Sequence, residues 1–134
     1  MNYYFLAFKR YSDFSGRSRR KEYWYFILFN LLTFSLCLSL DLAMISAGSS
    51  MIIFSMTYML ASLIPGLSVG VRRLHDIGKS GWNILLVLIP LIGAIILIIY
   101  YATDSQAGSN RYGFNPKEDG EEEMIERIGV TRAF

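Results

Sequence analysis

The sequence has one cysteine and one histidine, and that scarcity excludes two kinds of site. Cys37 has no second cysteine in the chain with which to form a disulfide. Structural and catalytic zinc sites need three or four nitrogen, sulfur or carboxylate ligands, which one cysteine and one histidine do not supply. The composition therefore predicts no metal centre, and no pattern in it indicates a cofactor.

Charge is absent from three long stretches, residues 23–40, 42–71 and 81–103. About 20 apolar residues in a helix cross a hydrocarbon layer of ~30 Å, because each residue adds about 1.5 Å. A chain of 134 residues, enough for one domain, cannot bury three such helices on every face in a soluble core. We therefore predict an all-α fold, a multi-pass membrane helical bundle of about three transmembrane helices. The expected spans lie near residues 23–45, 51–71 and 82–102.

Segments at both ends flank these spans. Tyr4, Phe8 and Tyr11 recur at helical spacing beside two basic residues, which predicts a short N-terminal helix in the headgroup region or packed as a cap on the rest of the chain. We expect residues 1–117 to form the integral membrane domain. Residues 118–134 are acidic and are expected to form a flexible tail.

The basic residues gather at two membrane edges. Residues 1–22 hold six Lys and Arg against two carboxylates, and residues 72–79 hold three against one. With three spans both segments fall on the same side, which the positive-inside rule assigns to the cytoplasm. The N-terminus and the Arg72–Gly81 loop are thus predicted to be cytoplasmic, and residues after the third span to face outward.

Small residues and prolines mark the second and third spans. Ser62, Gly66 and Gly70 form a stripe at four-residue spacing, along which another helix of this chain or of a second copy can pack closely. Pro65 and Pro90 predict kinks, because proline removes a backbone donor. A re-entrant hairpin folded at Pro90 is the alternative to a continuous third span.

The stretch RRLHDIGKSGW between the second and third spans contains Gly78-Lys79-Ser80, which matches the end of a phosphate-binding P-loop. That motif requires a glycine five positions before Gly78, where this chain has Arg73, and a strand before the loop. Without the glycine the backbone cannot wrap a phosphate, and nucleotide binding is excluded.

A weaker anion site remains open in the same stretch. Free N–H groups at the start of the next helix favour an anion, and Arg72, Arg73 and Lys79 are near enough in sequence to hold the phosphate of a lipid headgroup. Non-specific attraction of these basic residues to anionic lipid is the alternative.

His75 and Asp76 do not indicate an enzyme. Adjacent side chains seldom face each other, and no serine or oxyanion hole is evident to complete a hydrolytic site. We expect Asp76 to pair with Arg19, Arg20 or Arg73 instead, and we predict that the protein is not an enzyme.

Three motifs in order resemble a known bacterial family. They are Ser15-Gly16-Arg17 with Arg19-Arg20 through Glu22-Tyr23-Trp24; Arg72-Arg73-Leu74-His75-Asp76 with Ser80-Gly81-Trp82; and Gly108 with Asn110-Arg111-Tyr112-Gly113. Over about residues 1–117 the chain resembles the family called domain of unknown function 805. The resemblance implies a small multi-pass protein of the bacterial inner membrane, and it brings no established activity, substrate or catalytic residues.

Two of these motifs fall on the side predicted to be cytoplasmic, which suggests a polar network or an anionic headgroup site there. Its expected members are Arg17, Arg19, Arg20, Glu22, Arg72, Arg73, His75, Asp76 and Lys79. With three spans the third motif, Asn110, Arg111, Tyr112 and Gly113, is an outer-face loop; the three motifs can build one site only with a different span count.

Three functions remain in competition. The first is a non-enzymatic interaction or scaffold protein, or a helical bundle that contacts anionic lipid headgroups, with a homo-oligomer or a membrane protein as possible partner. The second is a transporter or channel component acting as an oligomer. The third is a membrane enzyme acting on lipid phosphates, which needs a nucleophile or metal that the sequence does not show. No nucleic-acid partner is expected.

Overall fold

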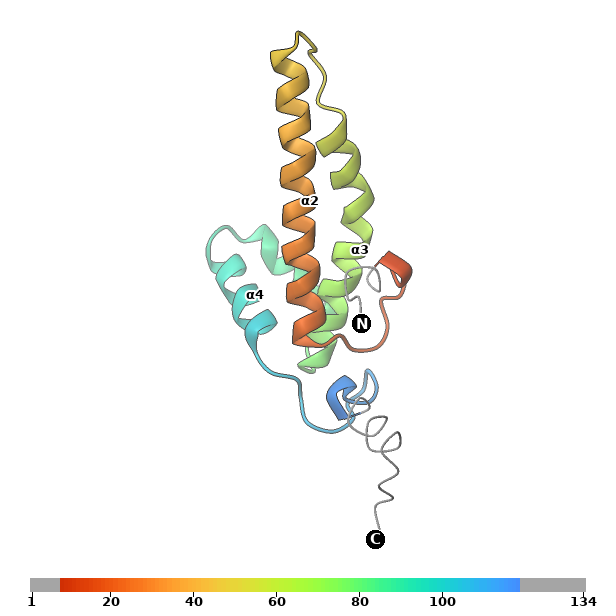
Figure 1. The fold of residues 1–134 in the computed structure, drawn as a ribbon. Coiled ribbons are helices and arrows are strands. Elements are labelled where there is room, and N and C mark those ends of the chain that lie inside the picture. Colours follow the sequence, from red (N-terminus) through yellow and green to blue (C-terminus); the bar gives the residue numbers. More distant parts are fainter. Residues whose placement is uncertain (1–7, 119–134) are drawn as a thin grey trace, which may run out of the picture. The chain divides into compact units, whose positions relative to one another are not determined.

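The computed structural model describes residues 8–118, and its elements are helical (Figure 1). They are α2 (Arg20–Ser46), α3 (Phe54–Asp76), a 3₁₀ helix η1 (Gly81–Leu88) and α4 (Ile92–Ala102). Within the described residues there is no strand, only an isolated bridge between Asn110 and Gly113. The chain divides into two units, residues 1–13 with 21–69 and residues 14–20 with 70–134.

The first unit is an antiparallel hairpin of α2 and the part of α3 before Gly70 (Figure 1). Phe26 and Val69 are fully buried against each other, with Phe8 and Tyr23 packed around them. Both helices are long and apolar enough to cross a membrane. They match the first two predicted spans, with α2 beginning three residues earlier and α3 ending five residues later than expected.

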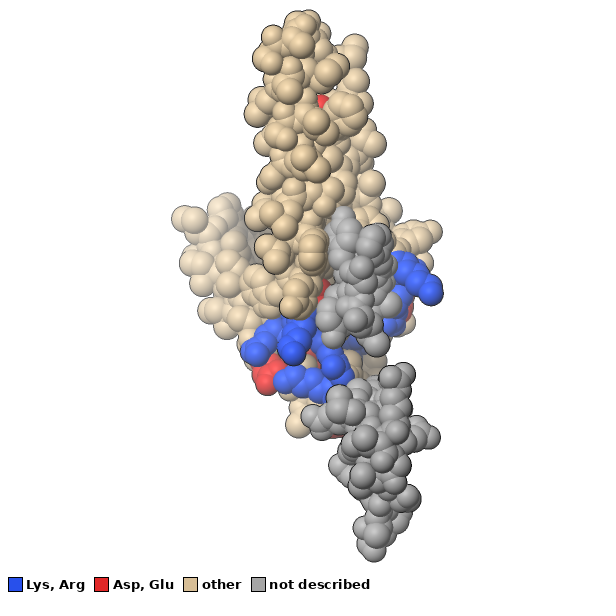
Figure 2. Space-filling model, viewed as in Figure 1, with Lys and Arg blue, Asp and Glu red and all other residues tan. Residues whose placement is uncertain are grey.

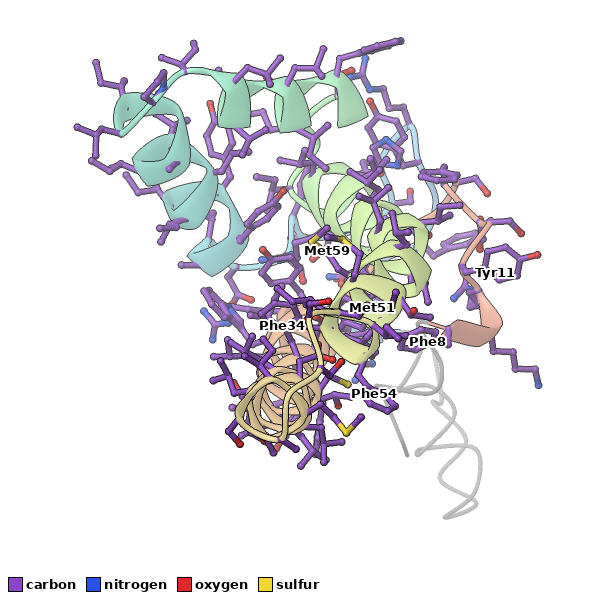
Figure 3. All side chains as sticks on the ribbon, turned by 90° about the horizontal axis from the view of Figure 1, so that it is seen from above. Phe8, Tyr11, Phe34, Met51, Phe54 and Met59 are labelled. Atoms are coloured by element: carbon purple, nitrogen blue, oxygen red, sulfur yellow. The ribbon has the colours of Figure 1, made fainter. Side chains whose placement is uncertain are left out.

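The hairpin exposes its apolar side chains. Leu31 and Leu60 are 60% and 64% exposed, and most large aliphatic residues of both helices are similarly open. On the face shown in Figure 2 the hairpin is uncharged over nearly its whole length. Figure 3 shows side chains extending outward around α2 and α3, Phe54 among them. Such a surface is stable against hydrocarbon and unfavourable in water.

Asp41 closes the far end of the hairpin by capping α3. Its carboxylate accepts the backbone N–H groups of Ile53, Phe54 and Ser55 at 3.1, 3.0 and 2.7 Å, and the Ser55 hydroxyl at 2.5 Å. The first N–H groups of a helix lack partners within the helix, and the positive end of its dipole attracts a carboxylate. A buried carboxylate thus sets where α3 begins, a role that the sequence did not indicate.

The chain before α2 is tied to α3 within the same unit. The Ser68 hydroxyl lies 2.6 Å from the carbonyl oxygen of Asp13 and 3.2 Å from that of Arg10. The ring of Phe8 lies 6.0 Å from that of Phe26. The predicted N-terminal interfacial helix falls mostly outside the described residues, as do the acidic residues after Glu118.

In the second unit α3 continues to Asp76, so the predicted Arg72–Gly81 loop is wrong for its first half. The helix stops at Gly78, whose φ of +73° is the left-handed conformation that glycine tolerates best. The Lys79 N–H donates to Leu74 O at 2.9 Å and the Gly78 N–H to His75 O at 3.0 Å, a Schellman-type cap. Ser80 then caps η1 through the Trp82 N–H. Gly78-Lys79-Ser80 therefore ends one helix and begins the next.

The expectation of a continuous third span over residues 82–102 is also wrong. The chain forms η1, turns at residues 89–91 with Leu91 at a φ of +62°, and returns as α4, which packs against η1. A Cβ on Gly93 would overlap the carbonyl oxygen of Leu86, so glycine permits this close packing. The two arms of this hairpin, η1 and α4, are each about 16 Å long, which is about half the thickness of a hydrocarbon layer.

Both ends of this η1–α4 hairpin meet the last turns of α3. At its start, a Cβ built on Gly81 would lie 3.3 Å from His75 Nε2. At its end, Arg73 donates to the carbonyl oxygens of Tyr101 and Thr103. The chain thus leaves and rejoins the same end of α3.

The small-residue stripe on α3 lies along contacts within the chain. Ser62 and Gly70 are buried, and a Cβ on Gly66 would meet the Phe26 ring at 3.7 Å. A Cβ on Gly70 would lie 3.3 Å from both Ile84 and the Tyr101 hydroxyl. These positions therefore already have neighbours in the same chain.

Candidate functional site: a buried arginine–aspartate cluster

Asp76 is the centre of a buried charged cluster in the second unit. It is fully buried, and its carboxylate accepts hydrogen bonds from Arg17 Nε at 2.9 Å, from an Arg73 Nη and from the Ser105 hydroxyl at 2.5 Å. Its backbone carbonyl accepts from Arg17 Nη2 and from the Gln106 N–H. A carboxylate is stable away from water when its lone pairs are paired in this way.

Arg17 joins three segments that are far apart in the sequence. Besides Asp76, its guanidinium donates to Gln106 O at 2.6 Å and to Gly108 O at 2.7 Å, and it lies 3.4 Å from Gly113 O. The five N–H donors of a planar guanidinium make this possible, and a lysine ammonium could not reproduce the geometry. Arg17 therefore holds residues 105–113 against the end of α3.

Arg73 and Arg20 hold the C-terminal end of α4. Arg73 donates to the carbonyl oxygens of Tyr101 and Thr103, and Arg20 Nη1 donates to that of Ala102 at 3.2 Å. The last carbonyl groups of a helix lack partners within it and form the negative end of its dipole. The two arginines donate hydrogen bonds to these carbonyl groups and place positive charge at the negative end of the dipole.

His75 is part of an adjoining stack. Its ring lies parallel to that of Tyr112, with centroids 3.8 Å apart at an angle of 4°. His75 Nδ1 lies 3.2 Å from Gly16 O, and the backbone oxygen of His75 accepts from Asn110 Nδ2 at 2.9 Å. The guanidinium carbon of Arg111 lies 4.7 Å from the centre of the Tyr112 ring.

The remaining sequence-predicted residues fall at different places. Arg19 donates to Pro116 O, and Arg72 is buried, with its carbonyl accepting the Ser18 N–H at 3.2 Å. Lys79 is exposed and lies 5.5 Å from the centre of the Tyr100 ring. Glu22 is buried and belongs to the first unit.

Asp76 therefore pairs with Arg73, one of the three arginines expected, and with Arg17 rather than Arg19 or Arg20. With three spans we expected the Asn110–Gly113 motif on the opposite face from the other two motifs, whereas the structure places it beside residues of both. Asn110 is bonded to His75, and Gly113 O lies beside Arg17. The parts of the three motifs at residues 15–20, 72–82 and 108–113 all lie within the second unit.

Sequence reasoning missed the carbonyl groups that complete the cluster. Backbone oxygens at residues 101–108 accept most of the arginine donors, and a backbone group carries no side-chain signal in the sequence. The turn at Asn110, where its side chain accepts the Tyr112 N–H, could have been found, because asparagine and glycine favour such turns.

The arginines of this cluster connect α3, the end of α4 and residues 105–113. Its donors and acceptors are used by one another, and the described residues contain no group of three or more His, Cys, Asp or Glu that could hold a metal ion. The charge, however, is strongly unbalanced. Residues 14–20 and 70–118 hold eight Lys and Arg against three carboxylates, a formal excess of five positive charges.

Two of those carboxylates are exposed and paired. The Lys117 ammonium at 2.5 Å and the Ser105 N–H lower the pKa of Asp104. The Gly108 N–H and the Asn115 amide lower the pKa of Glu118. Both therefore remain ionised near neutrality, and the surplus of five positive charges over residues 14–20 and 70–118 already counts them as negative.

Comparison with known proteins places the chain in a family. The family described as "Protein of unknown function (DUF805)" matches residues 11–114. The chain is 40% identical over 117 residues to the Escherichia coli K12 inner membrane protein YhaI, an alignment that covers 87% of this chain and 97% of YhaI. It is 41% identical over 120 residues to YhaH of the same strain, covering 87% and 98%. No solved structure matches it with comparable significance. The three clustered motifs all fall within the matched residues, and the chain belongs to the DUF805 family.

Proposed function

We propose that the protein is a non-enzymatic, multi-pass inner-membrane protein that presents a basic surface to anionic phospholipid headgroups. The observation that carries the proposal is the charge of the described part of the second unit, residues 14–20 and 70–118. It has three carboxylates, one of them buried within the arginine cluster, against eight basic residues. The relatives named as inner membrane proteins support the location.

In this proposal the protein has two spans, α2 and α3, and the η1–α4 hairpin enters the membrane from one side only. The return of residue 103 to Arg73 supports this arrangement. The N-terminal segment, the end of α3 and residues 103–118 then share one side. Because these segments hold the basic residues, the positive-inside rule assigns that side to the cytoplasm.

In this proposal the lipid-facing residues are exposed basic side chains of the second unit that do not contact the Asp76 carboxylate. Arg20, Lys79 and Arg111 are exposed. Each basic residue near an anionic surface contributes on the order of 1 kcal/mol of attraction. Three such residues on one scaffold favour an anionic bilayer by roughly 3 kcal/mol, about a hundredfold. The same surface can bind an acidic segment of a partner protein.

The test measures which lipids remain with the protein. The full chain is reconstituted in nanodiscs that contain phosphatidylcholine and phosphatidylglycerol in equal amounts, and retained lipids are counted after mild detergent extraction. We expect phosphatidylglycerol to be enriched, and enrichment to fall in a triple variant with Arg20, Lys79 and Arg111 changed to Gln.

Lys117→Gln is the matched control, because this exposed lysine is already neutralised by Asp104. It is expected to leave the enrichment almost unchanged. No enrichment with the unmodified chain, or an equal loss with Lys117→Gln and the triple variant, would contradict the proposed lipid contact.

A further inference from the structure

The second unit contains a cavity of about 500 Å³ between the end of α3 and η1. This volume lies in the range of small-molecule sites, which are mostly apolar with a few placed polar groups. Its apolar and aromatic walls are Phe14, Val71, Trp82, Ile84, Leu85 and Tyr112.

Apart from Tyr112 and Trp82, whose rings carry a hydroxyl and an N–H, the polar residues that line this cavity are His75 and Ser80. The Ser80 hydroxyl already accepts the Trp82 N–H at the cap of η1, at 3.4 Å. His75 Nδ1 lies 3.2 Å from Gly16 O, and because a carbonyl can only accept, Nδ1 carries the hydrogen. In the neutral ring the other nitrogen, Nε2, is then an acceptor. Among residues 8–118 it has no hydrogen-bond partner.

The position of Nε2 is fixed from two sides. Stacking on Tyr112 at 3.8 Å holds the ring plane, and the Gly16 contact holds its rotation. Gly81 keeps the approach to Nε2 open, because a Cβ there would lie 3.3 Å from Nε2 and 2.8 Å from Val71 Cγ1. The cavity thus offers a nitrogen acceptor of fixed orientation, His75 Nε2, in a mostly apolar space.

The mouth of the cavity carries apolar side chains. Trp82 is 78% exposed and Leu85 is 49% exposed. They belong to η1, one arm of the apolar hairpin. A ligand that reaches this mouth from a lipid phase keeps its apolar body out of water throughout.

We propose that this cavity binds a membrane amphiphile with a single hydroxyl on an apolar body, and that the hydroxyl donates to His75 Nε2. The ligand class follows from the acceptor: an ether or ester of the same shape leaves Nε2 without a donor, and an unpaired buried acceptor is costly. The site is independent of the basic surface, because none of the exposed basic residues lines it.

The test uses Trp82 as the reporter. The chain has two tryptophans, so Trp24→Phe leaves Trp82 as the only one. The full chain in detergent micelles is titrated with a bromine-labelled ten-carbon alcohol, its methyl ether and the matching bromoalkane, at equal mole fractions in the micelle. Bromine quenches tryptophan on contact. A brominated alkylphenol and its methyl ether show whether the body of the ligand is a chain or a ring.

We expect saturable quenching by the alcohol or the phenol, with half-saturation about tenfold lower than for the corresponding methyl ether, the size of one hydrogen bond. If the quenching curves of the alcohol and of the phenol coincide with those of their methyl ethers, the proposal is overturned. This result needs no variant at His75.

Variants locate the acceptor. His75→Phe keeps an aromatic ring against Tyr112 but removes both nitrogens, and Gly81→Ala places a methyl group in front of Nε2 while His75 stays. Both are expected to abolish the preference for the donor. Tyr112→Phe is the matched control, which keeps the stack and removes a hydroxyl from the cavity wall. Circular dichroism checks the fold of each variant. If His75→Phe does not fold, Gly81→Ala is tested with the same ligand series.

The assignment of His75 Nε2 as the acceptor would be overturned if folded Gly81→Ala still prefers the hydroxyl compound over its ether. It would also be overturned if Tyr112→Phe loses that preference.

Discussion

Asp41 and Asp76 are both buried carboxylates, one in each unit, and the molecule stabilises them in different ways. Asp41 accepts three backbone N–H groups and one hydroxyl at the start of α3. Asp76 accepts two guanidinium groups and one hydroxyl at its end. The chain carries no Lys or Arg from residue 22 to residue 71, so Asp41 lies in a stretch where dipoles must replace cations.

The difference reflects what surrounds each carboxylate. The first unit exposes apolar side chains and uses a single carboxylate to define one helix start. The second unit buries Arg17, Arg73 and Asp76, and the two arginines hold residues 101–108 through backbone carbonyl groups. A dipolar cap is local, whereas a guanidinium cluster joins segments that are remote in sequence. Substitutions at the two carboxylates should therefore differ in how much stability they cost and in how far along the chain their effects extend.

The largest effect is expected from Asp76→Ala. This change leaves two buried guanidinium groups without their carboxylate, and breaking a buried ion pair in this way costs about 3–5 kcal/mol. Equilibrium unfolding in mixed micelles, followed by circular dichroism, measures the loss. A loss no larger than that of an exposed substitution such as Arg111→Ala would contradict the role of Asp76.

Arg17→Lys should have the next largest effect. Lysine keeps the charge but not the planar set of donors that reach Gln106 O and Gly108 O, and hydrogen bonds to charged groups are worth about 1.5–3 kcal/mol. We expect faster proteolysis within residues 103–118 while α2 and α3 stay intact. Arg111→Lys, at an exposed arginine, is the control, and equal cleavage of both variants would weigh against the proposed tether.

Asp41→Ala should cost less than Asp76→Ala, because the N–H groups it frees belong to one helix turn. We expect local fraying at residues 53–55, seen as faster amide hydrogen exchange there, and unchanged exchange at residues 105–113. Ser39→Ala, at an exposed serine of the same helix, serves as control. Faster exchange at residues 105–113 would show that Asp41 and Asp76 do not stabilise their regions independently.

Much of the first unit could be predicted from the sequence, and less of the second. Uncharged runs of sufficient length predicted α2 and α3 because hydrocarbon solvation depends on composition and length. The same reasoning failed for residues 82–102, since a short hairpin and a single span have identical hydropathy. Pro90 indicated a break, and the conformation of Leu91, which turns the break into a reversal, has no signal in the residue type.

The candidate cluster could be predicted only in part from the sequence, for a similar reason. The motifs identified Arg17, Arg73 and Asp76 as members of one polar network. They could not choose among five nearby arginines, because the choice depends on where the chain returns after α4. The capping role of Asp41 could not be predicted either, since helix capping from a distant position leaves no local pattern in the sequence.

Glycine turns offer a finer comparison between the units. Gly78 and Gly48 both have positive φ, at +73° and +97°. A Cβ on Gly78 would lie 2.5 Å from Gln106 Oε1, while Gly48 has open space around it. Alanine at either site should cost about 1 kcal/mol of backbone strain, with a further loss at Gly78 only. Unfolding titrations of the two variants measure this, and an equal or larger loss at Gly48 would contradict it.

The smallest expected effect concerns Asp104 and Lys117 at the surface of the second unit. The lowered pKa of Asp104 means that this pair adds stability above the ordinary value of 3.8 and loses it as pH falls through the lowered value. Lys117→Met should raise the pKa of Asp104, although the Ser105 N–H still holds it partly down. Carbon NMR of the carboxyl group during an acid titration checks this, and an unchanged pKa would show that the pair does not form.

The central claim is that the chain after α3 returns to the side from which it left, so that all three motifs share one face. Single cysteines at Ser15, Ser50 and Ser109, in a Cys37→Ser background, can be labelled with an impermeant maleimide in right-side-out and inverted membrane vesicles. The account predicts that Ser15 and Ser109 positions react in inverted vesicles and the Ser50 position in right-side-out vesicles. Reaction of the Ser109 position together with the Ser50 position would mean that residues 81–102 cross the membrane, and would contradict the account.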